Sequence, residues 1–231
     1  MESRYDRQVM LPEIGEEGQR RLSSARVLIV GVGGLGSPIA LYLAGAGVGS
    51  IGLVDGDRVS RSNLQRQVLY AEDEIGELKA VRAKERLLRL NGSLNVTAYP
   101  TMLDAGNARE IISSYDIVVD GCDNFATRYL INDVCIEQDK VYVYGAIRAF
   151  DGQVSVFNYG GRYSYRDLFP DEEGMLSMPS PEKGVMGVTP GIVGSVEAAE
   201  VIKVICGFGE VLSGRLWHID LKTMSAGTFF I

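Results

Sequence analysis

Residues 26–47 constrain the fold more than any other stretch, because a buried strand passes through a glycine-rich turn directly into a helix. The apolar run RVLIVG (26–31) predicts the strand, and SPIALYLAGAG (37–47) predicts the helix. Glycines at such a turn let the backbone approach a phosphate closely, while amide groups and the helix dipole face the anion. We interpret the turn as a nucleotide-binding loop; its glycines are Gly31, Gly33, Gly34 and Gly36.

Strands and helices continue to alternate as far as residue 147. Apolar runs predict further strands, and segments with helical spacing of apolar residues predict helices between them. The predicted strands span 49–57, 94–99, 116–121 and 140–147, and the predicted helices span 75–90, 105–114 and 126–139. This alternation is typical of a doubly wound, mostly parallel α/β sheet of the Rossmann type.

The pattern changes after residue 147. The run GQVSVFNY (152–159) follows the preceding strand closely enough to form a hairpin, so we expect antiparallel C-terminal strands, with two more at 215–221 and 226–231. Residues 160–190 show no sustained period and predict a long crossover loop before a helix over 191–207. Residues 1–24 predict a helical lead-in. Because the sequence shows no internal repeat and no second core, we predict one nucleotide-binding domain over 1–231.

The overall charge and composition narrow the possible partners. A net charge of -7 argues against nucleic acid, since phosphate contacts need clustered Lys and Arg. No apolar run is long enough to span a bilayer, and the N-terminus lacks a signal-peptide pattern, so we expect a cytoplasmic protein without a membrane partner. The three cysteines are far apart and odd in number, which favours reduced thiols over a disulfide framework.

A carboxylate follows the glycine turn at the spacing that a ribose requires. Asp55 ends the second predicted strand, 19 residues beyond Gly36, where it can accept hydrogen bonds from ribose hydroxyls. The strand, the glycine turn, the helix and Asp55 occur together. We therefore favour nucleotide binding over the alternative that the glycines serve only tight packing. Taken alone, the arrangement suits NAD at least as well as ATP.

The stretch VDGDRVSRSNLQRQ (54–67) favours ATP over a hydride-transfer cofactor. A dehydrogenase needs no dense polar and basic cluster directly after its ribose-binding strand, whereas negative charge builds up on a departing pyrophosphate. Each residue alone could be a solvated surface group, but the set indicates a nucleotide site. Its members are Asp57, Asn63, Arg66, Gln67 and, a little later, Lys79.

Asp123 and Asn124 follow the predicted strand 116–121, at the edge of the sheet where α/β proteins bind ligands. An acidic side chain beside phosphates would be repelled unless a cation lay between them, so we predict that Asp123 binds Mg²⁺ directly or through water. Asn124 is a candidate for nucleotide binding. Capping of the next helix is a competing use of either residue.

Six motifs closely resemble those of the ThiF/MoeB/HesA adenylyltransferases, relatives of the ubiquitin-activating enzymes, and cover most of the chain in that family's order. They are RYDRQ (4–8), GVGGLG (31–36), VDGDRVSRSNLQRQ (54–67), GELK (76–79), DGCDNFATR (120–128) and GVMGVTPGIVGSVEAAEVIK (184–203). The resemblance implies a mostly parallel sheet in a homodimer. It assigns ribose binding to Asp55, phosphate binding to Asn63, Arg66 and Lys79, and Mg²⁺ to Asp123. Arg7 would reach into the other subunit's site.

The implied reaction activates the C-terminal glycine of a small ubiquitin-like sulfur-carrier protein ending in Gly-Gly. Its carboxylate attacks the α-phosphate of Mg-ATP, giving an acyl adenylate and pyrophosphate, as in thiamin or molybdopterin biosynthesis. This step needs positioning and charge stabilisation rather than a covalent nucleophile. The catalytic residues implied by the resemblance are Arg7, Arg66, Lys79 and Asp123.

The chain departs from the family's pattern in its cysteines. Many relatives hold a structural zinc with two CxxC pairs, but Ser164 and Asp167 stand where one pair belongs and the chain ends at Ile231 without the other, so we predict no zinc site. Ser180 stands where some relatives carry a loop cysteine, and we interpret Cys122 as a packing thiol. With no rhodanese-like extension either, we expect a separate sulfur donor.

Three other functions fit parts of the pattern. The same chemistry could adenylate a small molecule, a peptide or a tRNA base carboxyl, although the acidic charge disfavours tRNA. An NAD-dependent oxidoreductase is disfavoured by the cluster of Arg66, Lys79 and Asp123. A non-catalytic nucleotide-binding scaffold is disfavoured by the presence of these three residues together with Arg7.

Overall fold

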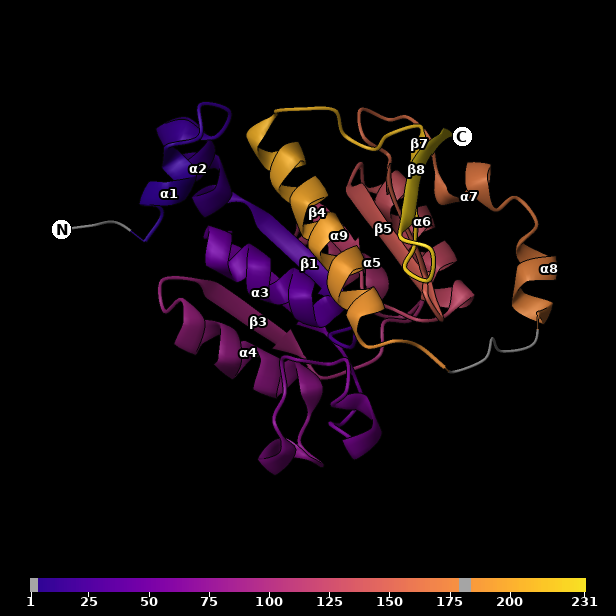
Figure 1. Ribbon diagram of the computed structural model, residues 1–231, viewed down its shortest axis with the longest axis horizontal. Helices are drawn as coiled ribbons and strands as arrows, with labels where there is room; N and C mark the ends of the chain where they lie inside the picture. The colour runs from indigo at the N-terminus through magenta and orange to yellow at the C-terminus, as the bar shows by residue number, and fades with distance from the viewer. Residues whose placement is uncertain (1–3, 179–183) are drawn as a thin grey trace.

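In the computed structural model, which describes residues 4–178 and 184–231, eight strands form one sheet in the order β3-β2-β1-β4-β5-β6-β7-β8 (Figure 1). The first five strands are parallel: β1 (Arg26–Val30), β2 (Ser50–Val54), β3 (Asn95–Tyr99), β4 (Ile117–Asp120) and β5 (Val141–Arg148). The remaining three pair antiparallel: β6 (Asp151–Phe157), β7 (Arg215–Asp220) and β8 (Ser225–Phe230). The predicted fold class is therefore confirmed.

Helices cover both faces of the parallel part of the sheet. Helices α3 (Gly36–Ala46), α4 (Lys79–Leu90) and α9 (Val188–Cys206) lie in front in Figure 1, and α5 (Ala108–Ser113) and α6 (Phe125–Glu137) lie behind. The central strand β1 alternates between the two apolar cores: Val27 and Ile29 face the front helices, whereas Leu28 and Val30 face the back ones. This burial on both faces explains why the strands are nearly continuous apolar runs.

The N-terminal lead-in consists of two helices, α1 (Asp6–Val9) and α2 (Gly15–Ser24). They pack at the end of α3 that lies farthest from the glycine turn. The Gln8 side chain donates to the carbonyl of Ala46 and to Gln19, at 3.1 and 2.7 Å. The hydroxyl of Tyr5 accepts a hydrogen bond from Asn91 at 2.8 Å. The lead-in is therefore anchored to the body of the protein.

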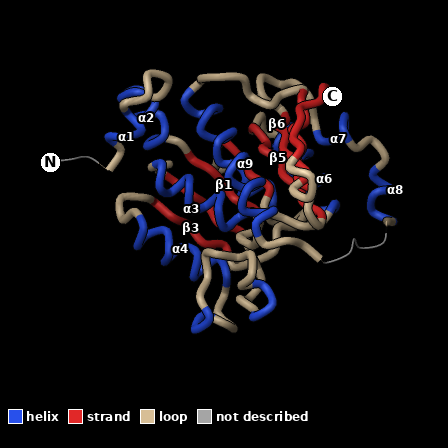
Figure 2. The backbone as a smooth tube through the Cα atoms, in the orientation of Figure 1, coloured by secondary structure: helices blue, strands red, loops and turns tan. Residues whose placement is uncertain are grey.

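Several predicted boundaries are wrong. Strand β2 ends at Val54 rather than at residue 57, because the Asp55 carboxylate binds the backbone amides of Val32 and Asp57 and turns the chain. The helix predicted over 75–90 begins at Lys79, after the left-handed Gly76. The segment before it carries two 3₁₀ helices, η1 (Arg61–Asn63) and η2 (Glu72–Glu74), and projects from the carboxyl edge of the sheet (Figure 2).

The described parts of the predicted crossover loop, residues 160–178 and 184–190, contain helices that the sequence analysis did not predict. These are α7 (Tyr165–Leu168) and α8 (Glu172–Ser177), and α9 begins at Val188 rather than at 191. Ser164 and Asp167 form a capping box at the start of α7, in which the amide and the hydroxyl of Ser164 donate to Oδ2 of Asp167, at 2.6 and 2.9 Å. The two residues that stand at the expected CxxC pair therefore cap a helix. Ser180 lies outside the described residues.

The backbone is crowded where the chain leaves β1, between the ends of β2 and β4. The Gly31 amide donates to Val54 at 2.7 Å, and the Gly121 amide donates to Val30 at 2.7 Å. Gly31 has φ +86°, and a Cβ atom there would lie 2.5 Å from the carbonyl oxygen of Gly121. A Cβ atom on Gly36 would overlap the Gly31 carbonyl oxygen. Only glycines fit this junction. It lies at the carboxyl ends of β1 and β4, where the strand order reverses. Doubly wound sheets bind ligands at this position, which we call the crevice.

No helix within residues 4–178 and 184–231 combines the length and apolar character needed to cross a membrane.

Gly31→Ala should lower the free energy of unfolding by at least about 2 kcal/mol, because it adds left-handed strain to a backbone clash. The matched control is Gly45→Ala in α3, where a Cβ atom meets nothing within 4 Å. That change should be neutral or stabilise by up to about 1 kcal/mol. Urea unfolding of both variants measures the difference, and equal midpoints would contradict the assigned crowding.

Candidate active site

Asp55 ties the glycine turn to the end of β2. Its carboxylate accepts hydrogen bonds from the amides of Val32 and Asp57, at 2.9 and 2.8 Å. Burial raises the pKa of this carboxyl group, while Lys79 and the two amides lower it. The carboxylate therefore shapes the loop in which a ribose-binding acid was predicted, and each of its oxygens retains further acceptor capacity.

Lys79 begins α4 with its side chain almost fully buried, only 5% exposed. Its Nζ atom pairs with Oδ2 of Asp57 at 3.0 Å, and its backbone amide donates to the carbonyl of Asp57 at 3.0 Å. Asp57 itself is 64% exposed, so the charge of a buried cation is balanced by a carboxylate at the mouth of the site. An incoming anion can replace that carboxylate without any change in the buried lysine stem.

The predicted phosphate-binding segment packs directly on the glycine turn. A Cβ atom on Gly33 would lie 3.3 Å from Nε2 of Gln67, and one on Gly34 would lie 3.6 Å from Cδ of Arg66. Asn63, at the end of η1, accepts both the Arg66 and Gln67 amides through its carbonyl, at 3.0 and 2.9 Å. These three residues thus lie together beside the glycine turn.

Gln67 has the most unusual environment of this set. It is 5% exposed, and its Oε1 atom has no hydrogen-bond partner among the described residues. A buried amide oxygen without a donor is costly unless a bound molecule satisfies it. The side chain approaches Gly33 through Nε2, which lies 3.3 Å from the Cβ position of that glycine, and not through Oε1.

The N-terminus of α9 completes this side of the crevice, a feature to which the sequence analysis assigned no role. Pro190 lies 3.2 Å from the Cβ position of Gly34, and Gly187 packs tightly against the backbone of Gln65. The first turn of this helix of 19 residues therefore packs against the glycine turn. Pro190 has no amide hydrogen, and the amide of Thr189 donates to the carbonyl of Met186 at 2.9 Å.

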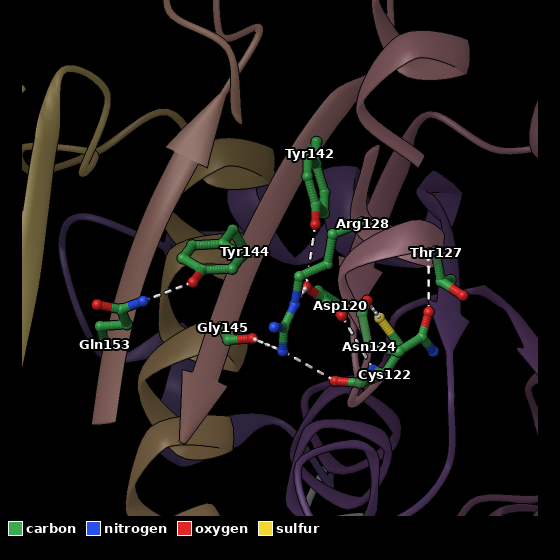
Figure 3. Close-up of polar contacts among 9 residues, drawn as sticks. All are labelled: Asp120, Cys122, Asn124, Thr127, Arg128, Tyr142, Tyr144, Gly145 and Gln153. Carbon is green, nitrogen blue, oxygen red and sulfur yellow. Dashed lines mark hydrogen bonds and ion pairs between the residues drawn. The ribbon is translucent and has the colours of Figure 1, made fainter. Parts of the chain in front are cut away.

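Behind the crevice lies a buried ion pair between Asp120 and Arg128 (Figure 3). Asp120, at the end of β4, accepts from Nε of Arg128, the hydroxyl of Tyr142 and the amide of Cys122, at 3.0, 3.0 and 2.9 Å. Arg128, from α6, also donates to the carbonyls of Cys122 and Gly145, at 3.1 and 3.4 Å. We call these interactions the Asp120–Arg128 clamp. Neither residue was predicted as part of the site.

The clamp holds the turn that carries Asp123. Both the amide and the carbonyl of Cys122 are bonded to it, so the residue preceding Asp123 is fixed at two points. Asp123 is exposed, and Asn124 caps α6 by accepting from the amide of Thr127 at 2.9 Å. The structure thus assigns Asn124 the capping role that the sequence left open, and leaves the Asp123 carboxylate at the crevice.

The cysteines lie in environments that favour the thiol form. Burial, followed by the nearby Asp120, raises the pKa of Cys122 well above its ordinary value. Burial also raises the pKa values of Cys135 and Cys206. A thiol that stays protonated is a poor nucleophile, which agrees with the interpretation of Cys122 as a packing residue.

The carboxylate at the crevice suits a Mg²⁺ ion that keeps water and phosphate ligands better than a metal ion held entirely by protein side chains. Among residues 4–178 and 184–231, no group of three His, Cys, Asp or Glu side chains is arranged to hold a metal ion. Mg²⁺ commonly binds through one or two carboxylates, with water and substrate phosphates as its other ligands. An exposed carboxylate beside the glycine turn, as at Asp123, suits that coordination.

Arg7 is the one predicted site residue that the structure keeps apart from the others. It is exposed on α1, which is anchored near Ala46 and Gly47 at the C-terminal end of α3. The glycine turn lies at the opposite end of this helix, and 11 residues of α-helix span about 16 Å. Arg7 therefore does not share a site with Lys79 within one chain.

Comparison with known proteins gives the family. The model of the ThiF family matches residues 5–230. The chain belongs to the ThiF family. A sulfur carrier protein adenylyltransferase from Thermus thermophilus is 50% identical over 223 residues, covering 94% of this chain and 82% of that protein. A probable molybdopterin-synthase adenylyltransferase from Porphyra purpurea is 47% identical over 234 residues, covering 99% of this chain but only 60% of that protein.

Solved structures show the same fold at lower identity. Escherichia coli MccB, crystallised with MccA, has a TM-score of 0.87 and 24% sequence identity, covering 100% of this chain and 72% of that one. PaaA has a TM-score of 0.84 and 23% identity, covering 99% of this chain and 72% of that one. This ThiF-family chain thus shares its architecture with both proteins.

Asp120→Asn should destabilise this ThiF-family protein by about 3–5 kcal/mol, because it leaves the Arg128 guanidinium buried without a counter-charge. Asp116→Asn is the matched control, since Asp116 pairs with Arg26 in a surface ion pair near the start of β4. That control should leave the unfolding midpoint almost unchanged. Thermal and urea unfolding measure both, and similar losses for the two variants would show that the clamp is not a buried ion pair.

Proposed function

We propose that this chain adenylates the C-terminal glycine carboxylate of a small ubiquitin-like sulfur-carrier protein, using Mg-ATP and releasing pyrophosphate. The observation that carries the proposal is the buried Lys79 beside the glycine turn, whose ion-pair partner is the exposed Asp57. Binding a triphosphate requires a cation whose counter-ion the phosphates can replace, whereas hydride transfer does not require one. The relative from Thermus thermophilus, a sulfur carrier protein adenylyltransferase, supports the choice of substrate.

In this proposal the glycine turn and the N-terminus of α3 bind the phosphates. Asp55 binds the ribose through the acceptor capacity that the loop amides leave free. Asn63, Arg66, Gln67 and Lys79 bind the triphosphate, and Asp123 binds Mg²⁺, which would neutralise charge on the leaving pyrophosphate. An oxygen of the glycine carboxylate forms a bond to the α-phosphorus while the bond from phosphorus to the bridging oxygen breaks. No proton moves in this step, so positioned positive charge is the main requirement.

The proposal further assigns Arg7 to the site of a second copy of the chain. Its anchoring at the far end of α3 rules out a role in its own site, while its exposed guanidinium remains available to a neighbour. Met10 and Leu11, directly after α1, are 69% and 50% exposed. Exposed apolar side chains next to Arg7 are suited to a surface that a partner subunit buries.

Sulfur transfer would follow on another protein. In the described part of the chain each thiol has a raised pKa, which disfavours a covalent link to the carrier. The acyl adenylate would therefore pass to a separate sulfur donor.

Pyrophosphate exchange tests the reaction. The chain with Mg-ATP and labelled pyrophosphate should exchange label into ATP only when a carrier ending in Gly-Gly is present. The same carrier lacking its last glycine is the control and should give no exchange. Exchange with a free peptide or small carboxylic acid instead would assign a different substrate, and no exchange with any acid would disprove adenylation by this chain.

Arg7→Ala and Asp123→Ala should each reduce exchange by about 100- to 1,000-fold, because each removes charge stabilisation from the reacting phosphates. Mixing the two inactive variants, with time for subunit exchange, should restore about a quarter of wild-type activity, since each mixed dimer contains one intact site. Arg20→Ala, at an exposed arginine of α2, is the control for the loss of a surface charge. No recovery on mixing, despite mixed dimers detected by mass spectrometry, would contradict the role of Arg7 in the partner.

A further inference from the structure

Glu197 lies in the middle of α9 with its carboxyl group buried against the sheet. Its relative exposure is 0%, and neither of its carboxyl oxygens has a hydrogen-bond partner among the described residues. Asp120, which is equally buried, receives three donors. One of the two buried carboxyl groups is therefore fully satisfied, and the other is left without a donor.

Gly145 connects Glu197 to the Asp120–Arg128 clamp. A Cβ atom on Gly145 would overlap the carboxyl group of Glu197, so the missing side chain makes the space that this group fills. On β5, Tyr144 belongs to the core behind the sheet, so the next residue, Gly145, has its side-chain position on the face of α9. Its carbonyl oxygen accepts from Nη2 of Arg128 at 3.4 Å (Figure 3). Glu197 and Arg128 thus contact the same residue of β5.

The surroundings of Glu197 oppose its ionisation. Burial, followed by the charge of Asp120, raises its pKa well above the ordinary value, and only Arg128 acts in the other direction. Helix α3 has no charged residue. Arg21 of α2 binds the carbonyl of Cys206, at the far end of α9, and Asp151 of β6 pairs with His218. Asp120 and Arg128 are therefore the charged groups that face this carboxyl.

We propose that Glu197 is a positioning residue that acts through Arg128. While the Glu197 carboxyl group is neutral and packed against Gly145, the guanidinium of Arg128 donates to Asp120 and to the carbonyl of Cys122. Loss of the Glu197 proton would place a second carboxylate near one buried guanidinium. Arg128 would then be shared between two anions, and its bond to the Cys122 carbonyl would weaken. The turn that presents Asp123 would lose one of its two fixed points. This role rests on the proposed function, because it concerns the geometry of the same nucleotide site.

The protonation state of Glu197 can be tested by stability alone. Between the ordinary pKa of a glutamate and the raised pKa of Glu197, the folded protein binds one more proton than the unfolded chain, so stability falls as the pH rises. The variant Glu197→Gln keeps the shape of the neutral acid and cannot ionise. The ratio of its folding equilibrium constant to that of the wild type should rise by up to about tenfold for each pH unit across this interval.

Glu200→Gln is the matched control. Glu200 is a second buried glutamate of α9, but it accepts from the amide of Leu212 at 2.8 Å and pairs with Lys203. Its substitution should lower stability at every pH without removing the alkaline slope. Urea unfolding from about pH 6 to about pH 9 gives the comparison. Parallel slopes for wild type and Glu197→Gln would overturn the proposal, because Glu197 would then not be neutral in the folded protein.

The action through Arg128 is tested by Mg-ATP affinity and pyrophosphate exchange over the same pH range. At neutral pH the wild type and Glu197→Gln should behave alike. Toward alkaline pH the wild type should lose affinity and exchange first, whereas the variant retains both. The pH dependence of stability could differ between the two proteins while that of Mg-ATP affinity and of exchange is the same. The Glu197 carboxyl would then be neutral without positioning the clamp, and the proposal fails. If Mg-ATP binds with this pH difference and no carrier supports exchange, the clamp role stands and the proposed carrier reaction fails.

Discussion

The architecture depends on a junction at which three stretches of backbone meet without side chains. At Gly31, Gly36 and Gly121 the end of β1, the start of α3 and the end of β4 approach so closely that a Cβ atom would collide with a carbonyl oxygen. This contact lets α3 begin almost directly over the end of β1. Beyond this contact the chain continues from β1 to α3 on one face of the sheet and from β4 to α6 on the other, so the glycine turn and the turn carrying Asp123 diverge at the crevice. Side chains there would close the crevice or push the helix away.

Two ion pairs lie near this junction, one at the surface and one in the core. At the mouth, Lys79 is balanced by an exposed carboxylate that a ligand can replace. Behind it, the Asp120–Arg128 clamp is fully buried and satisfied, so it cannot move to meet a ligand at low cost. The inner pair gives the crevice a fixed wall, while the outer pair remains exchangeable. This division suits a reaction whose main demand is that donors and cations are already in place.

The sequence predicts the parts of this structure that depend on local pattern. Apolar runs and glycine spacing are sufficient for the parallel strands, the glycine turn and the position of Asp55, because a doubly wound sheet repeats one local unit. The clamp was missed because Asp120 ends an apolar strand and Arg128 lies in a helix, and nothing local shows that the two meet. A charge at the end of a buried run was the available signal. Glu197 was missed for the same reason, since its significance depends on Gly145, distant in sequence.

The capping box at Ser164 and Asp167 has a consequence for the cellular conditions under which the protein holds its shape. A hydroxyl and a carboxylate that cap a short helix are supplied by the chain itself. A pair of thiolates in the same place would have tied the order of this segment to metal supply and to the redox state of its surroundings. The start of α7 is therefore insensitive to both chelators and oxidants, so its order should persist when either changes.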